Sequence, residues 1–427
     1  MQLAHVNVGH KSLADYASIS GRGLMDEIRT LAAPLEGKRV LHLSATAFGG
    51  GVAEINYALV PLMRDAGLET DWRVISGQEE FFEVTKTIHN ALQGDPRGLT
   101  AAQRAVFERY NRANAEKLDG EWDFVIVHDP QPAAIIEHAR RAGRHWVSRI
   151  HIDLSTPNRD VLHYLERWFG LYDAMVFHRR QYVPPPNGIP AAYIWAPAID
   201  PLAPKNMALS PEDAAYIVDQ FGIDVDRPLL TQVSRFDHWK DPIGVIDAWR
   251  IVREEHPGVQ LALVGSMAHD DPEGWDYYNR TVDAAGGDPD VFILSNLNNV
   301  GSVEVNAFQV HSDVLVQKSI REGFGLTVTE ALWKAKPMVA GRAGGIVDQI
   351  HEGETGFLVE SVAECAEACA SVLDDSEHAR AMALRGKEEV RHRFLMPRLL
   401  RDWLALFNRL EGYDTGQTEL VRARGAV

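Results

Sequence analysis

The segment that decides the fold is Asp123-Phe124-Val125-Ile126-Val127-His128-Asp129. Its centre is continuously apolar, as in a strand of a parallel sheet that is buried on both faces. Segments of the same kind come at 38–44, 71–75, 145–152, 173–177 and 191–195, with helical stretches at 52–65, 79–117 and 158–169 between them. This alternation predicts an α/β domain built on a doubly wound parallel sheet.

The second half of the chain repeats this pattern after a break. Residues 196–212 hold four prolines, which is typical of an interdomain linker. The strands predicted beyond it lie at 229–234, 259–264, 291–294, 314–316, 337–340 and 356–359, and the helices at 241–255, 273–285, 301–311, 326–335 and 344–351. The last 65 residues are expected to be mostly helical, whereas residues 1–36 show no clear period and are expected to pack as an extension on the first domain.

We therefore expect two domains, 1–205 and 206–394, each with a doubly wound parallel sheet. Ligands of such folds bind outside the carboxyl ends of the strands. The predicted site is a cleft where the strand ends of the two domains face each other.

The composition of the chain indicates which kinds of binding partner are disfavoured. Hydrophobic residues make up 45% of the 427 and charged residues 24%, as in an ordinary globular protein. The net charge of −17 disfavours nucleic acids and anionic membranes as partners. No apolar run approaches the roughly 20 residues of a membrane span, and no signal peptide is visible, so we expect a cytoplasmic protein. The two cysteines, Cys365 and Cys369, have helical spacing, which favours two thiols on an amphipathic helix over a metal site.

A glycine-rich turn, Gly49-Gly50-Gly51, lies between a predicted strand and a predicted helix. Backbone N–H groups at such a turn and at the start of a helix attract phosphate, although a simple flexible turn has the same sequence. The spacing does not match the Gly-x-Gly-x-x-Gly pattern of dinucleotide-binding proteins, so NAD is disfavoured.

Arg235 and Lys240 follow another predicted strand. The planar fork of arginine and the point charge of lysine could together hold a diphosphate and stabilise it as it leaves. The alternative is ordinary surface charge, because Asp241-Pro242 resembles the cap and first residue of a helix.

Two glutamates, Glu322 and Glu330, lie eight residues apart across a glycine-rich turn and a predicted helix. Paired carboxylates suggest a glycosidase, but both belong to one segment, whereas glycosidases flank the bond from two sides. Binding of ribose hydroxyls by the second glutamate is chemically simpler. A third acidic motif, Asp224-Val225-Asp226, precedes its strand and so falls at the wrong end of the sheet; we expect no metal requirement.

Polar side chains also follow the strands of the first half: Asp129 and Gln131 after one strand, and His151 and Asp153 after another. Such groups at strand ends can bind sugar hydroxyls. A lone histidine in this position more often serves only to satisfy internal hydrogen bonds.

Taken together, these elements resemble the retaining glycosyltransferases that include glycogen synthase, sucrose synthase and trehalose-phosphate synthase. The most specific parts are Arg235 with Lys240 and the pair Glu322 and Glu330, with support from the glycine turn and His151. Four further segments are similar to trehalose synthases of the glycosyl-transferring type, and to retaining trehalose phosphorylases: 43–54, 128–131, 151–153 and 233–237.

The resemblance implies the GT-B fold, with two Rossmann-like domains and a final helix, 395–427, that crosses back onto the first. It implies transfer of glucose from ADP-glucose or UDP-glucose to free glucose, giving α,α-trehalose reversibly. No cofactor is expected besides the nucleotide sugar, and the expected partners are small sugars and nucleotides. Dimers are common among the relatives, but no feature of this sequence decides for a homodimer.

The resemblance also implies roles for single residues in binding the donor. Arg235 and Lys240 would clamp the diphosphate, and Glu330 would bind the ribose. Glu322 would hold the sugar hydroxyls near C3. The remaining donor contacts would come largely from backbone groups, at Gly49, Gly50, Gly51, Gly323, Phe324, Gly325, Asn298 and Val300.

In the first domain, the same resemblance implies that His151 contacts the donor sugar near its 6-hydroxyl. Asp129, Gln131 and Asp153 would bind the acceptor. By family inference, the acceptor attacks from the face that the diphosphate leaves, without a covalent intermediate.

Three alternatives stay open. A phosphorylase of the same fold would use inorganic phosphate in place of the nucleotide. A transferase with a phosphorylated acceptor would need further basic residues, for which Arg22, Lys38 and Arg73 are candidates. A nucleotide-sugar binding protein without turnover would keep the ligand contacts but form no product.

Overall fold

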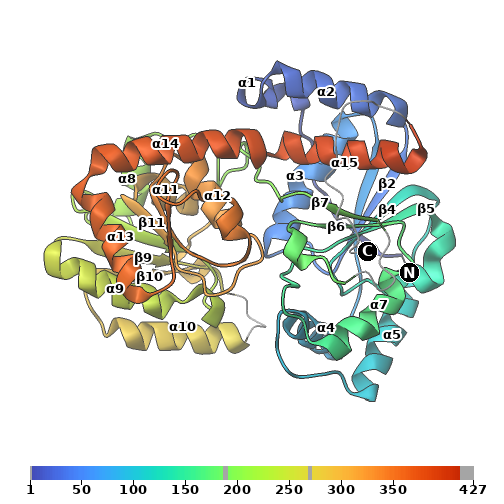
Figure 1. Cartoon of the computed structure of the whole chain (residues 1–427), viewed down its shortest axis with the longest axis horizontal. Helices are drawn as coiled ribbons and strands as arrows, with labels where there is room; N and C mark the ends of the chain where they lie inside the picture. Colours follow the sequence, from blue (N-terminus) through green and yellow to red (C-terminus); the bar gives the residue numbers. More distant parts are fainter. Residues whose placement is uncertain (1, 186–190, 268–271, 414–427) are drawn as a thin grey trace. The chain divides into compact units, whose positions relative to one another are not determined.

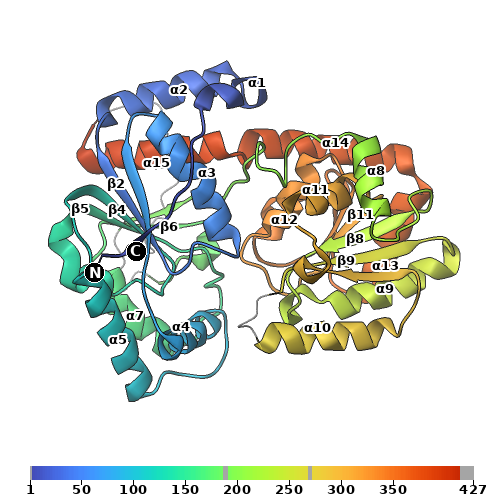
Figure 2. The ribbon, with the colours of Figure 1, turned by 180° about the vertical axis from the view of Figure 1, so that it is seen from behind.

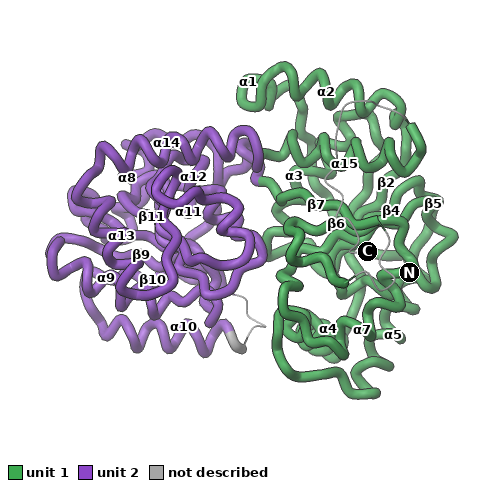
Figure 3. The backbone as a smooth tube through the Cα atoms, viewed as in Figure 1, with its two compact units in different colours: residues 1–198, 395–427 green, residues 199–394 purple. Residues whose placement is uncertain are grey.

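The computed structural model describes residues 2–185, 191–267 and 272–413. The chain divides into two compact units (Figure 3). The N-terminal unit comprises Met1–Ala198 together with Leu395–Val427, and the C-terminal unit comprises Ile199–Phe394.

The N-terminal unit is built on a seven-stranded sheet with the order β1-β3-β2-β4-β5-β6-β7. All neighbouring strands are parallel except the short edge strand β1, which runs antiparallel to β3. The strands are β1 (Ala4–His5), β2 (Arg39–Ser44), β3 (Glu69–Val74), β4 (Trp122–His128), β5 (Gly143–Arg149), β6 (Ala174–Phe177) and β7 (Ala191–Ile194).

Helices cover both faces of this sheet: α2, α3 and α15 lie on one side, and α4, α5 and α7 on the other (Figures 1 and 2). The helices are α1 (Ala17–Ser20), α2 (Arg22–Ala32), α3 (Gly51–Asp65), α4 (Glu79–Leu92), α5 (Ala101–Ala115), α6 (Ile135–Ala139), α7 (Arg159–Phe169) and α15 (Met396–Glu411). The last helix, α15, packs against α2 and α3, so the end of the chain completes the fold of its beginning.

Alternation along the strands decides which side chains face which layer. In β4, Val125 and Val127 belong to the large core that includes residues of α4, α5 and α7. Phe124 points the opposite way and stacks on Phe407 of α15, with the ring centroids 4.2 Å apart. His128 has the same parity as Phe124, so it lies on the face that carries α15.

The C-terminal unit contains a six-stranded, wholly parallel sheet with the order β10-β9-β8-β11-β12-β13. The strands are β8 (Leu229–Val233), β9 (Gln260–Val264), β10 (Val291–Leu294), β11 (Val314–Gln317), β12 (Met338–Gly341) and β13 (Phe357–Val359). The order places β8 and β11, which are distant in sequence, next to each other in the middle of the sheet.

Seven helices belong to the described part of this unit, and α9 packs beside α13, α8 beside α11, and α12 beside α14. They are α8 (Pro211–Asp219), α9 (Pro242–Glu255), α10 (Pro272–Ala285), α11 (Ser302–His311), α12 (Leu326–Trp333), α13 (Val362–Asp374) and α14 (Ser376–Arg393). One apolar core lies under α9 and α13, and a second under α8 and α11. Both cysteines are buried, unbridged thiols on α13.

The two parallel sheets confirm the predicted α/β fold class. One local prediction was wrong. Residues 344–351 do not form an α-helix but a short 3-10 helix, Gly344–Asp348, where consecutive glycines disfavour a longer helix. Residues 1–36 pack on the N-terminal unit, as expected, and contain α2 and the strand β1, which the sequence pattern did not predict. The end of the predicted terminal helix, 414–427, lies outside the described residues.

Within the described ranges, no helix combines the length and the apolar character that crossing a membrane would require.

Candidate active site

The carboxyl ends of β8 and β11 bring together the cation and the carboxylate that the sequence singles out. Because the strands are parallel neighbours, the segments that follow them leave the sheet at the same edge. Lys240 ends a 3-10 helix after β8, and its ammonium forms an ion pair with the Glu322 carboxylate in the segment after β11. Both side chains are mostly buried, with 15% and 12% of their surfaces exposed.

A second ion pair holds the backbone next to Lys240 in place. Asp241 adopts a left-handed conformation with φ 49°, and its carboxylate caps α9 by accepting a hydrogen bond from Gly244 N at 3.1 Å. The same carboxylate is paired with the Lys318 ammonium. A side chain at Gly244 would place its Cβ 2.2 Å from an Asp241 oxygen, so any residue other than glycine would displace the Asp241 carboxylate. Lys318 and Asp241 thus fix the backbone that follows Lys240.

Arg235 is more open than Lys240. Its side chain is 69% exposed and lies 3.2 Å from the Asp237 carboxylate. The Asp237 carboxylate also accepts a hydrogen bond from Lys240 N at 3.1 Å. Arg235 and Lys240 therefore belong to one hydrogen-bonded turn, in which the arginine side chain is exposed.

The glycine-rich turn before α12 is held by backbone contacts. Gly325 has φ 87°, which favours glycine, and precedes the first residue of α12. Gln349 donates to Phe324 O at 2.6 Å, and Gly345 N donates to Gly323 O at 3.0 Å. The Phe324 ring is buried against Phe394, with centroids 5.6 Å apart.

Glu330 is completely buried in α12. One carboxylate oxygen lies 2.8 Å from the Lys205 ammonium, and the other accepts a hydrogen bond from Gln309 at 3.1 Å. Lys334, one helical turn further, has its pKa lowered to about 7 by burial, against the opposing charge of Glu330. The structure therefore places Glu330 among internal partners and not at the surface.

The segment after β10 forms a compact turn. Ser295 N donates to the Asn298 side chain at 3.1 Å, and Val300 N donates to Ser295 O at 3.1 Å. Asn298 is exposed, whereas Val300 is buried. The amide of Val300 is occupied internally, so in this segment Asn298 is the more accessible of the two predicted contacts.

In the N-terminal unit, the glycine turn leads from β2 into α3. Gly49 and Gly50 have φ values of 66° and 102°, and nothing lies within 4 Å of an added Cβ at either position. Conformation, and not crowding, therefore demands glycine. Phe48, just before them, is 77% exposed, so the turn lies open to solvent.

The ends of β4 and β5 are tied together by Asp129. This residue has φ 63° and is buried, and its carboxylate accepts a hydrogen bond from His151 N at 2.7 Å. Burial raises the pKa of Asp129 to about 7, although the His151 amide and the charge of Arg149 oppose the shift. Asp153 is also buried and caps Ser155 N at 2.7 Å. Gln131 is half-buried.

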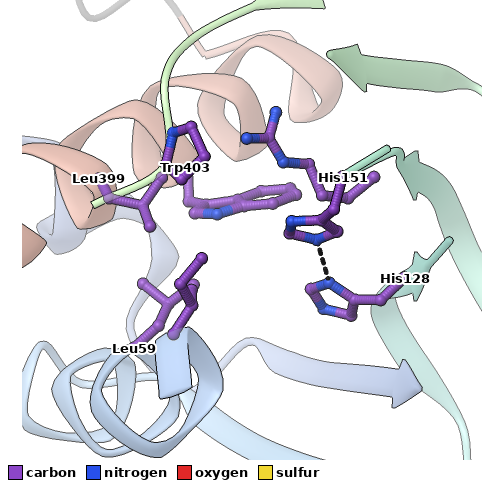
Figure 4. A pocket seen from close by; sticks show the side chains of 8 residues that line it. Leu59, His128, His151, Leu399 and Trp403 are labelled. Atoms are coloured by element: carbon purple, nitrogen blue, oxygen red, sulfur yellow. Dashed lines mark hydrogen bonds between the residues drawn. The ribbon is translucent and has the colours of Figure 1, made fainter. Parts of the chain in front are cut away.

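His151 is hydrogen-bonded to a second histidine and borders a small pocket. Its Nε2 lies 3.0 Å from His128 Nδ1 (Figure 4). The pocket, about 10 Å³ in volume, has room for about one water molecule. It is lined by Ile55, Leu59, His128, Arg149, His151, Pro197, Leu399 and Trp403.

The charged group of this pocket is Arg149. Its guanidinium donates to Trp195 O at 3.2 Å, and burial lowers its pKa to about 9. The pKa of His151 lies well below the usual range because of burial and the nearby Arg149 charge. His151 is therefore neutral at pH 7.

No group of three or more His, Cys, Asp or Glu side chains that could hold a metal ion occurs in the described part of the chain. The motif Asp224-Val225-Asp226 precedes β8, at the amino end of the sheet. The carboxylates near the site face lysines instead: Glu322 faces Lys240, and Asp241 faces Lys318.

Sequence reasoning missed several residues around the predicted ones. Lys205 pairs with Glu330, and the charge of Arg149 acts on His151, whereas Lys318 and His42 contact Asp241 and His128. A polar residue directly after an apolar strand could have pointed to Lys318, as it did to Asp129. The positions of His42 and Arg149 within their strands were a second available signal, because alternation along a strand decides which face of the sheet a side chain reaches. Nothing in the sequence marks Lys205, because its contact depends on how the segment after residue 198 folds back on α12.

Comparison with known proteins places the chain among glycosyltransferases. Residues 42–184 match the family model "Trehalose synthase, N-terminal domain", and residues 215–389 match "Glycosyl transferases group 1". The trehalose synthase of Rubrobacter xylanophilus is 60% identical over 96% of this chain and 100% of its own length. The trehalose synthase of Pyrococcus horikoshii is 47% identical over 95% and 98%. Trehalose phosphorylase of Pleurotus pulmonarius is only 28% identical, over 81% of this chain and 54% of its own length.

Solved structures agree on the fold. A trehalose-6-phosphate enzyme structure from E. coli, bound with UDP-2-fluoro glucose, has a TM-score of 0.68 and 15% identity, covering 90% of this chain and 100% of that one. Sucrose-phosphate synthase from Thermosynechococcus elongatus has a TM-score of 0.66 and 16% identity, covering 88% and 99%. The fold is therefore that of the two-domain GT-B enzymes, and the full-length matches show that this chain belongs to the trehalose synthase family of glycosyltransferases.

Proposed function

We propose that the protein transfers glucose, with retention, from ADP-glucose or UDP-glucose to free glucose, forming α,α-trehalose in a reversible reaction. The observation that carries this proposal is the pairing of Lys240 with Glu322 at adjoining strand ends, beside the exposed Arg235. A cation cluster next to a carboxylate suits a ligand that is anionic at one end and hydroxyl-rich at the other.

In this proposal, the cations act on the leaving group. Arg235 and Lys240 bind the diphosphate and neutralise the charge that develops as the bond from C1 of glucose to the diphosphate oxygen breaks. Glu322 accepts hydrogen bonds from sugar hydroxyls near C3, and backbone groups of Gly323 to Gly325 add contacts. His151 contacts the donor sugar near its 6-hydroxyl.

The acceptor completes the reaction. Its hydroxyl oxygen bonds to C1 from the face that the diphosphate leaves, and its proton goes to an oxygen of the departing diphosphate. The stereochemistry at C1 is retained without a covalent intermediate. Asp129, with Gln131 and Asp153, is the proposed acceptor region; because Asp129 is buried and bound to the His151 amide, its contribution includes holding His151 in place.

Glu330 fits the proposal less directly. Ribose hydroxyls could reach its carboxylate only if the contacts of Lys205 and Gln309 rearranged, since no part of Glu330 is exposed. We retain the ribose contact as part of the proposal. A Glu330→Gln variant should raise the KM for the nucleotide sugar more than it lowers kcat.

A phosphorylated acceptor is the less favoured alternative. Lys38 is paired with Asp123 and Glu411 before the start of β2, at the edge opposite the glycine turn. Arg73 is paired with Asp71 and Asp119. Each of these two cations is therefore held by two carboxylates, whereas Lys240 faces one. Arg22 is an exposed residue that opens α2.

The test is a product assay. The protein is incubated with ADP-glucose or UDP-glucose, with and without free glucose, and the sugars are followed by proton NMR. We expect the symmetric anomeric signal of α,α-trehalose, and only when glucose is present. Nucleotide release without a disaccharide would refute free glucose as the acceptor.

The second candidate function is that of a phosphorylase. It is favoured by the similarity to trehalose phosphorylases, which are 26–28% identical to this chain. It predicts turnover of trehalose with inorganic phosphate and indifference to ADP and UDP. Thermal stabilisation by a nucleotide sugar without any product would instead indicate a binding protein.

A further inference from the structure

Three histidines from adjacent strands form a hydrogen-bonded column, here called the histidine column. His42 lies on β2, His128 ends β4, and His151 follows β5. His42 Nδ1 is 2.9 Å from His128 Nε2, and His128 Nδ1 is 3.0 Å from His151 Nε2. The rings are stacked, with centroids 5.2 Å apart at both steps and interplanar angles of 18° and 24°.

Each ring in the column is neutral. Burial lowers the pKa of His42 to about 3 and holds the pKa of His128 well below its usual range. The Arg149 guanidinium adds to the effect on His128 and His151, and His178 adds to it on His151. A neutral imidazole carries one N–H and one lone pair. Two consecutive N···N hydrogen bonds can therefore run in only two directions along the column.

The two directions differ at the ends of the column. If the protons point toward His151, its Nδ1 carries the remaining N–H. If they point toward His42, the buried Nε2 of His42 carries it. In the described part of the chain, that nitrogen has no hydrogen-bond partner, and the neighbouring Trp403 side chain offers no conventional acceptor. An orphaned buried N–H is rarer than an unfilled acceptor, so the first direction is favoured.

At the other end of the column, an N–H at Nδ1 of His151 could be donated to a ligand. No hydrogen bond from this nitrogen to another described residue is present, and the His151 ring borders the pocket beside Trp403 (Figure 4). The backbone of His151 is independently fixed by Asp129. The ring can therefore present its Nδ1–H to a ligand at no cost to the hydrogen bonds of the protein.

We propose that the histidine column fixes His151 as the Nδ1–H tautomer, so that it donates a hydrogen bond to a hydroxyl oxygen of the sugar substrate. His128 and His42 are then positioning residues that act through His151. This inference rests on the proposed contact between His151 and the donor sugar, but the direction of the column does not depend on that contact.

The direction is tested on the wild-type enzyme without substrate. Protein labelled with 15N in the histidine rings is observed by long-range proton–nitrogen NMR at pH 7, and the His151 signals are identified by their loss in His151→Asn. We expect a protonated Nδ1 and an unprotonated Nε2. A proton on Nε2, or on both nitrogens, would overturn the proposal.

The consequence for the reaction is tested with two variants at His128. The amide of Asn in His128→Asn keeps a donor near the position of Nδ1, whereas His128→Phe keeps a ring but removes both nitrogens. Each is assayed with the glucose donor and with the corresponding 6-deoxyglucose donor. The matched control is His163→Asn, an exposed histidine on α7.

We expect the wild type, His163→Asn and His128→Asn to prefer the 6-hydroxyl donor by about 10-fold to 100-fold in kcat/KM, the effect of one lost hydrogen bond. In His128→Phe this preference should fall below about threefold. A merely structural role for His128 would lower both rates and leave their ratio unchanged, which would overturn the positioning role.

The two measurements separate the inference from the proposed function. A protonated Nδ1 with no preference for the 6-hydroxyl donor in the wild type would refute the proposed His151 contact and leave the direction of the column standing. A proton on Nε2 with a normal preference would refute the inference and leave the proposed function intact.

Discussion

Replacing Lys240 with Met tests the ion pair with Glu322 and the proposed role in the reaction together. Methionine keeps the apolar stem and removes the charge. An exposed pair contributes about 0.2–1 kcal/mol, and breaking a fully buried one costs about 3–5 kcal/mol. The side chains of Lys240 and Glu322 are 15% and 12% exposed, so we expect a loss of about 1–3 kcal/mol in the free energy of unfolding.

The effect on turnover should be larger than the effect on stability. A charge aimed at a leaving diphosphate contributes about as much as one oxyanion donor, so kcat should fall by about 10²–10³-fold. The pair can be isolated with Glu322→Gln and the double variant. In the double variant no buried charge is left alone, so its stability loss should be smaller than the sum of the two single losses.

The assays are urea unfolding of the four proteins and nucleotide release with the preferred donor. Near-wild-type turnover of Lys240→Met would refute the diphosphate role. If the stability loss of the double variant equals the sum of the two single losses, Lys240 and Glu322 do not stabilise the protein as a coupled pair. This outcome does not depend on the measured activities.

Three further predictions concern charge and metal. Arg235→Ala should change the unfolding free energy by less than about 0.5 kcal/mol, because the side chain is exposed, but it should raise the KM for the nucleotide sugar about tenfold; an unchanged KM would contradict the anion contact. The pKa of Asp129 is raised to about 7 in the folded protein, so the contribution of Asp129 to stability falls as pH rises from about 4 to 7. Asp129→Asn keeps an acceptor for His151 N and should therefore gain stability relative to wild type over that pH range. Urea unfolding at several pH values measures the difference, and a pH-independent difference would contradict the prediction. EDTA should leave most of the transferase activity; complete loss, restored by Mg²⁺, would show a metal requirement.

Most of the fold could be predicted from the pattern of apolar strands in the sequence. Buried parallel strands are apolar throughout, and they alternate with helices, so both sheets could be predicted. The exceptions are local. The helix α2 has a strongly amphipathic face that became meaningful only once α15, from the other end of the chain, was known to pack on it. Sequence periodicity does not say which distant segment covers an apolar stripe.

The site was partly predictable for the same reason. Parallel strands end at one edge, so Lys240 and Glu322 could be expected near each other without knowing the strand order in full. The position of Glu330 was less accessible to sequence reasoning. Its spacing from Glu322 suggested a shared orientation, but the packing of α12 buries it against Lys205 and Gln309. Contacts between side chains on different elements depend on packing, which spacing alone does not encode.

The ion pairs of the C-terminal unit suggest an order of events in donor binding. Lys240 and Lys318 are each neutralised by a carboxylate, Glu322 and Asp241, so neither presents a free charge. Arg235 is also paired, with Asp237, but its side chain is 69% exposed, so of these three cations it is the one that an anionic donor would meet first. On the proposed function, the diphosphate then competes with Glu322 for Lys240. The Glu322 carboxylate that this exchange releases becomes available for sugar hydroxyls at the moment the sugar arrives. Capture of the diphosphate and recognition of the sugar would thus be coupled through one ion pair, whereas the pair of Lys318 and Asp241 keeps the backbone in place during the exchange.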